Sequence, residues 1–284
     1  MLNQKNLQNL VENRPDLVRA KRSERYPELR VVKYKNNVFY DNLWNEDPLL
    51  VECRGLVIDD EYNVVVKPFT KIFNRFENKT DIPRDELCTI VQKVNGFLGV
   101  VTNWKNRSIV STTGTLDSDY ARMAETYIGQ YGTKLQVGAT ALFEIVDPCD
   151  PHIIEERIGS HLIGINENGY WYTENELDMI HAVQGVGDYR PRWSRGVPFS
   201  EAVKYAKGAK HEGYVVYGRN TTLKLKSPYY LTTKLFARMK GEKLKRILES
   251  DQPLRVDEDY LPVVEHLRKH VDVFNYMHEQ QRVK

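Results

Sequence analysis

Lysine 93 and the short segment after it are the first residues of this chain that could do chemistry. Lys93 lies between two apolar, strand-like runs, residues 87–91 and 98–101, and Gly96 follows three positions later. A lysine that has lost its proton is a nucleophile able to attack phosphorus, and a nearby glycine lets the backbone approach a ligand. The same segment contains Asn95-Gly96, the strongest signal of a tight hairpin turn, and lysine is common beside such turns. Both interpretations, nucleophile and ordinary hairpin, are open at this point.

Four further charged residues stand where apolar strands are expected. Glu144 interrupts an apolar run and Glu212 begins another, although a buried carboxylate is costly unless it meets a cation, a metal or a hydroxyl. Lys224 and Lys226 share one face of a strand, because side chains alternate with period two, and they repel unless an anion such as phosphate lies opposite. Each charge alone is explained by a strand edge that faces water. Together with Lys93, in this order, they indicate a covalent nucleotidyltransferase.

The composition narrows the class of protein. The chain has 284 residues, 41% hydrophobic and 28% charged, as in a soluble globular protein of one large domain or two modest ones. No apolar run is long enough to span a bilayer, and residues 1–13 hold no apolar signal core. Three widely spaced cysteines fit no zinc motif and predict reduced thiols. We therefore expect a cytoplasmic protein, or one of the host cytoplasm if the chain is viral, with no membrane partner.

Hydrophobic periodicity and turn residues predict an α+β fold with antiparallel sheets and flanking helices. A strand-rich domain is expected over residues 1–230 and a small helical region over residues 231–284, because strand patterns end near Pro228. Pro15 is expected to interrupt the first helix. The expected strands are residues 29–34, 38–43, 49–59, 63–68, several between 89 and 111, 140–146, 162–166, 214–217 and 222–226, and the expected helices are residues 7–22, 118–131, 174–182, 200–206, 231–249 and 261–281.

The ordered charges resemble the motifs of one superfamily. Polynucleotide ligases and capping enzymes carry Lys-x-x-Gly, a glutamate, Glu-Gly and Lys-x-Lys, which here would be Lys93 to Gly96, Glu144, Glu212-Gly213 and Lys224 to Lys226. Within it, the chain is most similar to the T-even phage RNA ligase and to the ligase module of fungal tRNA ligases. The resemblance spans residues 50–230, and the segments that carry the finer match are Glu52-Cys53-Arg54-Gly55, Lys71-Ile72-Phe73-Asn74, residues 114–119 and residues 143–148.

This resemblance implies an ATP-dependent RNA ligase (EC 6.5.1.3 type), in which residues 1–230 form the adenylyltransferase domain. ATP would adenylylate the lysine, AMP would pass to an RNA 5′-phosphate, and an RNA 3′-hydroxyl would displace it. Mg²⁺, with Mn²⁺ as an alternative, would bind Glu212 and Glu144. The implied catalytic residues are Lys93, Glu212, Lys224 and Lys226, and the implied nucleotide site contains Arg54, Lys71, Phe73, Gln92, Lys93, Gly96, Glu144, Glu212, Lys224 and Lys226.

Some finer properties follow from the same resemblance. Glu144 would accept from the ribose hydroxyls, a side chain from residues 162–165 would stack on adenine, and cations such as Mg²⁺ or Lys226 would depress the pKa of Lys93. About 58 residues follow Lys226 and read as helices, so no OB domain is expected. That favours RNA ends as the substrate: a single-stranded or nicked RNA, with cleaved tRNA as one candidate.

Two departures from the superfamily pattern keep other functions open. Asn95 stands where aspartate is commonest, and Phe97 where serine or threonine is commonest. Asparagine at this position is also similar to the fungal tRNA ligases. One alternative is a catalytically impaired RNA-binding module of the same fold. Another is a GTP-using, capping-type nucleotidyltransferase, against which the absence of an expected OB domain argues.

Overall fold

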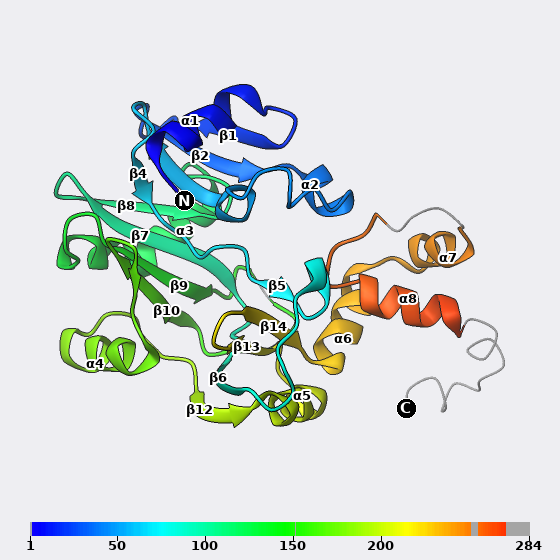
Figure 1. The fold of residues 1–284 in the computed structure, drawn as a ribbon. Coiled ribbons are helices and arrows are strands. Elements are labelled where there is room, and N and C mark those ends of the chain that lie inside the picture. The colour runs from blue at the N-terminus through cyan, green and yellow to red at the C-terminus, as the bar shows by residue number, and fades with distance from the viewer. Residues whose placement is uncertain (1, 151, 251–254, 271–284) are drawn as a thin grey trace.

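Three β-sheets stand at the centre of the molecule, and helices cover their outer faces (Figure 1). The computed structural model describes residues 2–150, 152–250 and 255–270. Among the named strands of these described ranges, pairing is antiparallel except between β14 and β5, so the predicted α+β fold with antiparallel sheets and flanking helices is confirmed. None of the helices within the described ranges is both long and apolar enough to span a bilayer.

The N-terminal sheet has the order β1-β2-β3-β4 and packs on α1 and α2. For residues 7–22, the expected interruption at Pro15 is confirmed because α1 ends at Asn13, whereas the helix predicted beyond it is wrong because residues 18–22 form a strand that pairs with β2. The strand predicted for residues 38–43 is also wrong. Residues 36–40 instead form α2, which buries Val38 in the core beneath the N-terminal sheet. The bounds are α1 (Gln4–Asn13), β1 (Val18–Arg22), β2 (Leu29–Tyr34), α2 (Asn36–Tyr40), β3 (Arg54–Asp59) and β4 (Val64–Val66), with a 3₁₀ turn at Leu50–Glu52.

The second sheet has the order β11-β10-β9-β7-β8 and lies between two layers. One face packs on α3 and α4, and the other carries part of the core that it shares with the N-terminal sheet. Ser118 caps α3 by accepting from the Ala121 N–H. The bounds are β7 (Phe97–Trp104), β8 (Arg107–Thr112), α3 (Asp119–Ile128), β9 (Thr140–Val146), β10 (Gly159–Glu167), β11 (Tyr170–Trp171) and α4 (Glu174–Gln184), with a 3₁₀ helix at Gly129–Lys134.

The third sheet has the order β12-β6-β13-β14-β5, and α5 covers one of its faces. Strand β6 belongs to this sheet and β7 to the second sheet, so Lys93 to Gly96 joins two sheets. The hairpin interpretation of Asn95-Gly96 is therefore wrong, because β6 and β7 do not pair with each other. The bounds are β5 (Phe73–Asn74), β6 (Leu87–Gln92), β12 (Trp193–Pro198), α5 (Phe199–Gly208), β13 (Gly213–Tyr217) and β14 (Thr222–Lys226), with a 3₁₀ turn at Glu77–Lys79.

After β14, the described residues form three short helices: α6 (Pro228–Arg238), α7 (Gly241–Glu249) and α8 (Leu261–Lys269). They share a small core of their own around Leu235, Met239 and Val264. The single helix predicted for residues 231–249 is in fact two, since Met239 and Lys240 are extended. The domain boundary that we predict between residues 230 and 231 falls inside α6. For the helix predicted over 261–281, residues 271–281 lie outside the described residues.

Candidate active site

Lys93 lies where β6 leaves the third sheet, and its side chain meets two glutamates from other strands. Its backbone N–H donates to the Gly213 carbonyl at 2.9 Å, which continues the pairing of β6 with β13. Its Nζ lies 3.1 Å from Glu212 Oε1 and 3.8 Å from Glu144 Oε1. The fold thus brings together three residues that are more than 50 positions apart from one to the next, as the motif order predicts.

Gly96 is required by a close approach between two backbones. A Cβ at this position would lie 2.2 Å from the Ile145 carbonyl oxygen of β9, far inside van der Waals contact. The Gly96 N–H donates to Glu144 Oε1 at 3.1 Å, so the backbone also holds that carboxylate. From the sequence, the glycine is expected to let the backbone approach a ligand. In the structure, the close approach is to β9.

Glu212 is the most buried charge of the cluster, with 2% of its surface exposed. Its Oε1 accepts from Lys226 Nζ at 2.7 Å and faces Lys93 as well. Burial favours the protonated acid, yet the two ammonium groups outweigh burial and lower the pKa of Glu212 to about 2. The next residue, Gly213 (φ +131°), must be a glycine, because a Cβ there would lie 2.0 Å from the Leu225 carbonyl oxygen. The carboxylate is therefore charged and held between two lysines.

Lys93 is protonated in this arrangement. Burial favours its neutral amine and Lys226 adds to that effect, but the carboxylates of Glu212 and Glu144 outweigh both and raise the pKa of Lys93. Lys226 thus lowers this pKa, as predicted, but in the protein without a bound ligand the two carboxylates make the net shift upward. A reaction at Nζ first requires that the two carboxylates find another positive partner.

Asn95 holds Glu212 in place from the side opposite the lysines. Its Nδ2 donates to Glu212 Oε2 at 2.8 Å, and its Oδ1 accepts from the Ile154 N–H at 3.1 Å. The Asn95 backbone N–H faces Glu156, a third carboxylate; burial raises the pKa of Glu156, and Glu212 and Glu144 act in the same direction. An asparagine can donate to Glu212 where an ionised aspartate cannot. Glu156 is not among the site residues predicted from the sequence.

We expect Asn95→Ala to lower the free energy of unfolding by about 1–3 kcal/mol, because it leaves buried hydrogen-bonding groups of Glu212 and Ile154 unpaired. Chemical denaturation of the variant and wild type measures this difference. Asn220→Ala, in the exposed turn after β13, is the matched control and should change it little. Equal stability of Asn95→Ala and wild type would show that these two hydrogen bonds do not hold the site.

Lys224 and Lys71 share a carboxylate partner, Glu258, that is not among the residues predicted from the sequence. Lys224 Nζ donates to Glu258 Oε1 at 2.8 Å, and Lys71 Nζ pairs with the other oxygen of Glu258 and with Glu77. Burial, helped by Lys226 and Lys71, lowers the pKa of Lys224 to about 8, although Glu258 opposes this. Asp259 likewise accepts from Lys226 at 2.9 Å. The available signal in the sequence was the acidic run of residues 257–259 beside a strongly basic helical region.

The remaining predicted site residues lie around this cluster at different distances from its chemistry. Phe73 packs edge-on against Trp44, and the Lys71 ammonium lies 5.3 Å from its ring centre, so its side chain belongs to the N-terminal core. Arg54 begins β3 and is half-buried, and Gln92 ends β6 opposite Tyr214. Contacts of Arg54, Phe73 and Gln92 with a nucleotide stay predictions.

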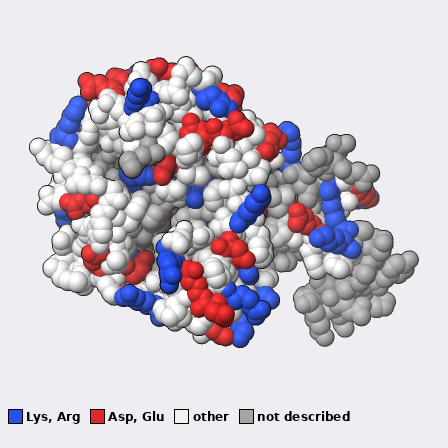
Figure 2. Space-filling view, viewed as in Figure 1, with Lys and Arg blue, Asp and Glu red and all other residues white. Residues whose placement is uncertain are grey.

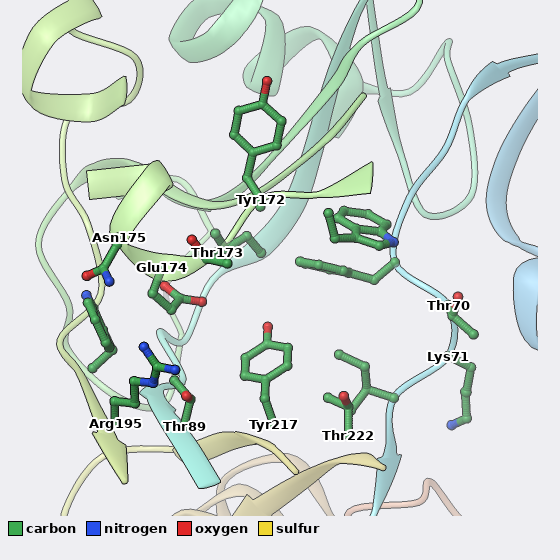
Figure 3. Close-up of a pocket in the computed structure, with 16 residues that line it drawn as sticks. Thr70, Lys71, Thr89, Tyr172, Thr173, Glu174, Asn175, Arg195, Tyr217 and Thr222 are labelled. Atoms are coloured by element: carbon green, nitrogen blue, oxygen red, sulfur yellow. The ribbon is translucent and has the colours of Figure 1, made fainter. Parts of the chain in front are cut away.

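A cavity of about 710 Å³ opens between the second and third sheets (Figure 3). Tyr217 points into it from β13, and Thr89 and Thr222 line it from the strands on either side. Thr222 and Lys224 are two positions apart on β14, so their side chains lie on the same face of the strand. The cavity and the lysine cluster therefore share that face of the third sheet. Lys71 lines the cavity, whereas Lys93, Glu144 and Glu212 do not. The cavity therefore extends from the lysine cluster at Lys71. The cavity and the cluster together are called the cleft below.

Charge on the outer surface is mixed. In Figure 2, lysine and arginine side chains are interspersed with aspartate and glutamate over the face shown. The net charge of +2 agrees with this distribution. Attraction of a polyanion therefore depends on local groups, above all those in the cleft.

Solved structures to which this fold is similar include ATP-dependent ligases. An archaeal ATP-dependent RNA ligase (form 2) aligns with a TM-score of 0.56 and 12% identity over 99% of this chain and 78% of its own. A putative ATP-dependent DNA ligase from Aquifex aeolicus aligns with a TM-score of 0.52 and 12% identity over 92% and 71%. At such identity the likeness establishes the fold, which is the nucleotidyltransferase fold of these ligases.

The sequence identifies the family within that fold. A model of the RNA ligase family matches residues 52–230, more than half of the chain, and the protein belongs to this family. The matched range includes all ten residues assigned to the nucleotide site, and it confirms the resemblance on which that assignment rests. No curated protein sequence matches the chain.

Proposed function

We propose that this protein is an ATP-dependent RNA ligase that joins RNA 5′-phosphate and 3′-hydroxyl ends through a covalent lysyl-AMP. The observation that supports this most is the position of Lys93 Nζ, 3.1 Å from Glu212, with Lys226 on the same carboxylate. A nucleophilic nitrogen and phosphate-binding cations thus meet at the end of a cleft large enough for a nucleoside.

In the first step, the neutral Lys93 amine attacks the α-phosphorus of ATP. A bond forms between nitrogen and phosphorus, the bond from phosphorus to the pyrophosphate oxygen breaks, and the nitrogen ends with one proton fewer. Lys224 and Lys226 hold the oxygens on which charge develops, because phosphoryl transfer depends chiefly on alignment and charge neutralisation. Arg54 and Lys71 close around the other phosphates. AMP then passes to an RNA 5′-phosphate, and the 3′-hydroxyl of a second end displaces it.

Glu144 and Glu212 are the side chains that would hold a divalent cation. Within the described residues no three acidic, histidine or cysteine side chains form a ready metal cluster. Mg²⁺ is commonly held by one or two carboxylates together with substrate phosphates, and these two carboxylates beside Lys93 fit that donor set. When bound, the metal would neutralise phosphate charge and would replace Lys93 as the positive partner of the carboxylates.

The cavity beside the cluster is our proposed site for the nucleobase. Within residues 162–165, Ile163 is the side chain that lines the cavity; Leu162 and Ile165 are buried in the core on the opposite face. Ile163 is therefore our choice for the side chain that contacts the adenine.

We expect Ile163→Trp to weaken ATP binding about tenfold or more, because the larger ring fills the cavity rather than a packed core. Titration of wild type and variant with ATP, followed by calorimetry, gives the two dissociation constants. Val183→Trp adds the same ring at an 81% exposed position of α4 and should leave binding unchanged. Unchanged affinity in Ile163→Trp would exclude the cavity as the base site.

The proposed function is tested by ligation of 5′-phosphorylated RNA. Single-stranded RNA, nicked RNA and cleaved tRNA should be joined or circularised with ATP, and a matched DNA should be joined poorly or not at all. RNA binding without any AMP adduct would favour the impaired binding module. Covalent labelling by GTP in place of ATP would favour the capping-type enzyme.

A further inference from the structure

The C-terminal region contains three consecutive acidic residues, and the second and third of them contact the lysines of the candidate active site. These residues, Asp257, Glu258 and Asp259, are called the acidic segment below. They precede α8, which packs with α6 and α7 in the small C-terminal core (Figure 1). Residues 255–260 thus connect a peripheral helical region with the site on the third sheet.

The acidic segment neutralises the lysines that the proposed function assigns to phosphate. Glu258 accepts from Lys224 with Oε1 and pairs with Lys71 through Oε2. Asp259 Oδ2 accepts from Lys226 at 2.9 Å and from Lys234 of α6. All three lysines of the nucleotide site outside the Lys93 motif therefore have carboxylate partners from one segment.

The geometry of these pairs is that of a bound anion. Glu258 spans two lysines from different elements with its two oxygens, much as two oxygens of a phosphate chain would. Lys71, Lys224 and Lys226 are each at least 89% buried at the side chain, so a cation left without an anion there would be costly. The segment supplies that anion while the nucleotide is absent.

One feature distinguishes this contact from a permanent structural one. Asp259 Oδ1 is buried and has no hydrogen-bond partner among the described residues. Buried carboxylate oxygens are normally paired, and an unpaired one costs free energy. The acidic segment is therefore not an optimal fit to its position, which favours replacement by another anion.

We propose that the acidic segment is an internal competitor: Glu258 and Asp259 occupy the phosphate-binding lysines and leave them when a polyphosphate binds. The identity of that polyphosphate as part of ATP rests on the proposed function; the competition itself does not. Binding of the nucleotide and displacement of residues 255–260 are then one coupled event, and apparent affinity is reduced by the population of the occupied state.

Inorganic triphosphate is the probe that separates competition from a structural role. Calorimetric titration should show that Glu258→Gln/Asp259→Asn binds triphosphate about tenfold or more tightly than wild type, because two competing carboxylates are gone while side-chain shape is kept. Asp257→Asn is the matched control: Asp257 is 51% exposed at its side chain, and an asparagine keeps the oxygen that accepts from the Asp259 N–H. Its affinity should equal that of wild type. Equal or weaker binding by the double variant would overturn the proposal.

A second measurement uses the wild-type chain alone and does not depend on the fold of any variant. Hydrogen exchange at the amides of residues 255–260 should become faster when triphosphate is added. Unchanged or slower exchange would overturn the proposal. If triphosphate displaces the segment but ATP gives no covalent label, the competition stands and the ligase function falls; if ATP labels Lys93 without displacement, the reverse holds.

Discussion

Lys93→Ala is expected to abolish covalent labelling of the protein by α-³²P-ATP. Labelling should fall by at least about 10⁴-fold, to the level of a blank, because alanine offers no nitrogen to attack phosphorus. The rest of the site should persist: Glu212 retains Lys226 at 2.7 Å and the hydrogen bond from Asn95, so its charge is not left unpaired. Gel autoradiography after incubation with Mg²⁺ measures the label.

Lys207→Ala controls for the removal of a lysine as such. Lys207 lies exposed near the end of α5, away from the cleft face of the third sheet. This variant should label like wild type, and thermal melting should show that both variants are folded. Labelling of Lys93→Ala at the wild-type level would remove Lys93 as the nucleophile.

Gly96→Ala is expected to cause the second largest loss. The added methyl would lie 2.2 Å from the Ile145 carbonyl oxygen and 3.1 Å from Glu144 Cγ, so either the Lys93 segment or β9 must move by about 1 Å. A displacement of that size in a phosphoryl-transfer site costs about 10²-fold in rate. Single-turnover labelling with ATP gives the rate constant, and thermal melting gives the accompanying loss of stability.

The matched control for this prediction is Gly208→Ala. Gly208 ends α5, and a Cβ there would meet nothing within 4 Å. Its labelling rate should equal that of wild type. A Gly96→Ala protein that labels at the wild-type rate would mean that the two backbones separate at little cost and that the close approach does not position Lys93.

The motif residues were predictable because a buried charge without a partner costs free energy. A glutamate inside an apolar strand and two lysines on one strand face each require a partner of opposite charge. The structure supplies Lys93 and Lys226 to Glu212, as the order of charges indicates. Local sequence pattern also predicted most strands and the start of α3, where Ser118 accepts from a backbone N–H.

Long-range pairing decided what local pattern could not. Asn95-Gly96 carries a strong hairpin signal, yet β6 pairs with β13 and β7 with β9, because each has a better partner far along the chain. Residues 38–43 have the composition of a strand, yet α2 covers Asn36–Tyr40 and buries Val38 in the N-terminal core. The net pKa shift of Lys93 also depends on the tertiary structure, since burial and one ammonium group lower the pKa while two carboxylates at 3.1 and 3.8 Å raise it by more.

By itself, the sequence determined the family, the nucleophile candidate and the charges that must surround it, because these depend on residue type and order. Only the tertiary structure decided that Asn95 donates to Glu212, that Gly96 admits the backbone of β9, and that Glu258 and Asp259 occupy the lysines of the cleft. These contacts join residues that lie 33 to 117 positions apart in the sequence. Local sequence patterns do not specify contacts between residues far apart in the chain, and burial strengthens the electrostatic part of such contacts.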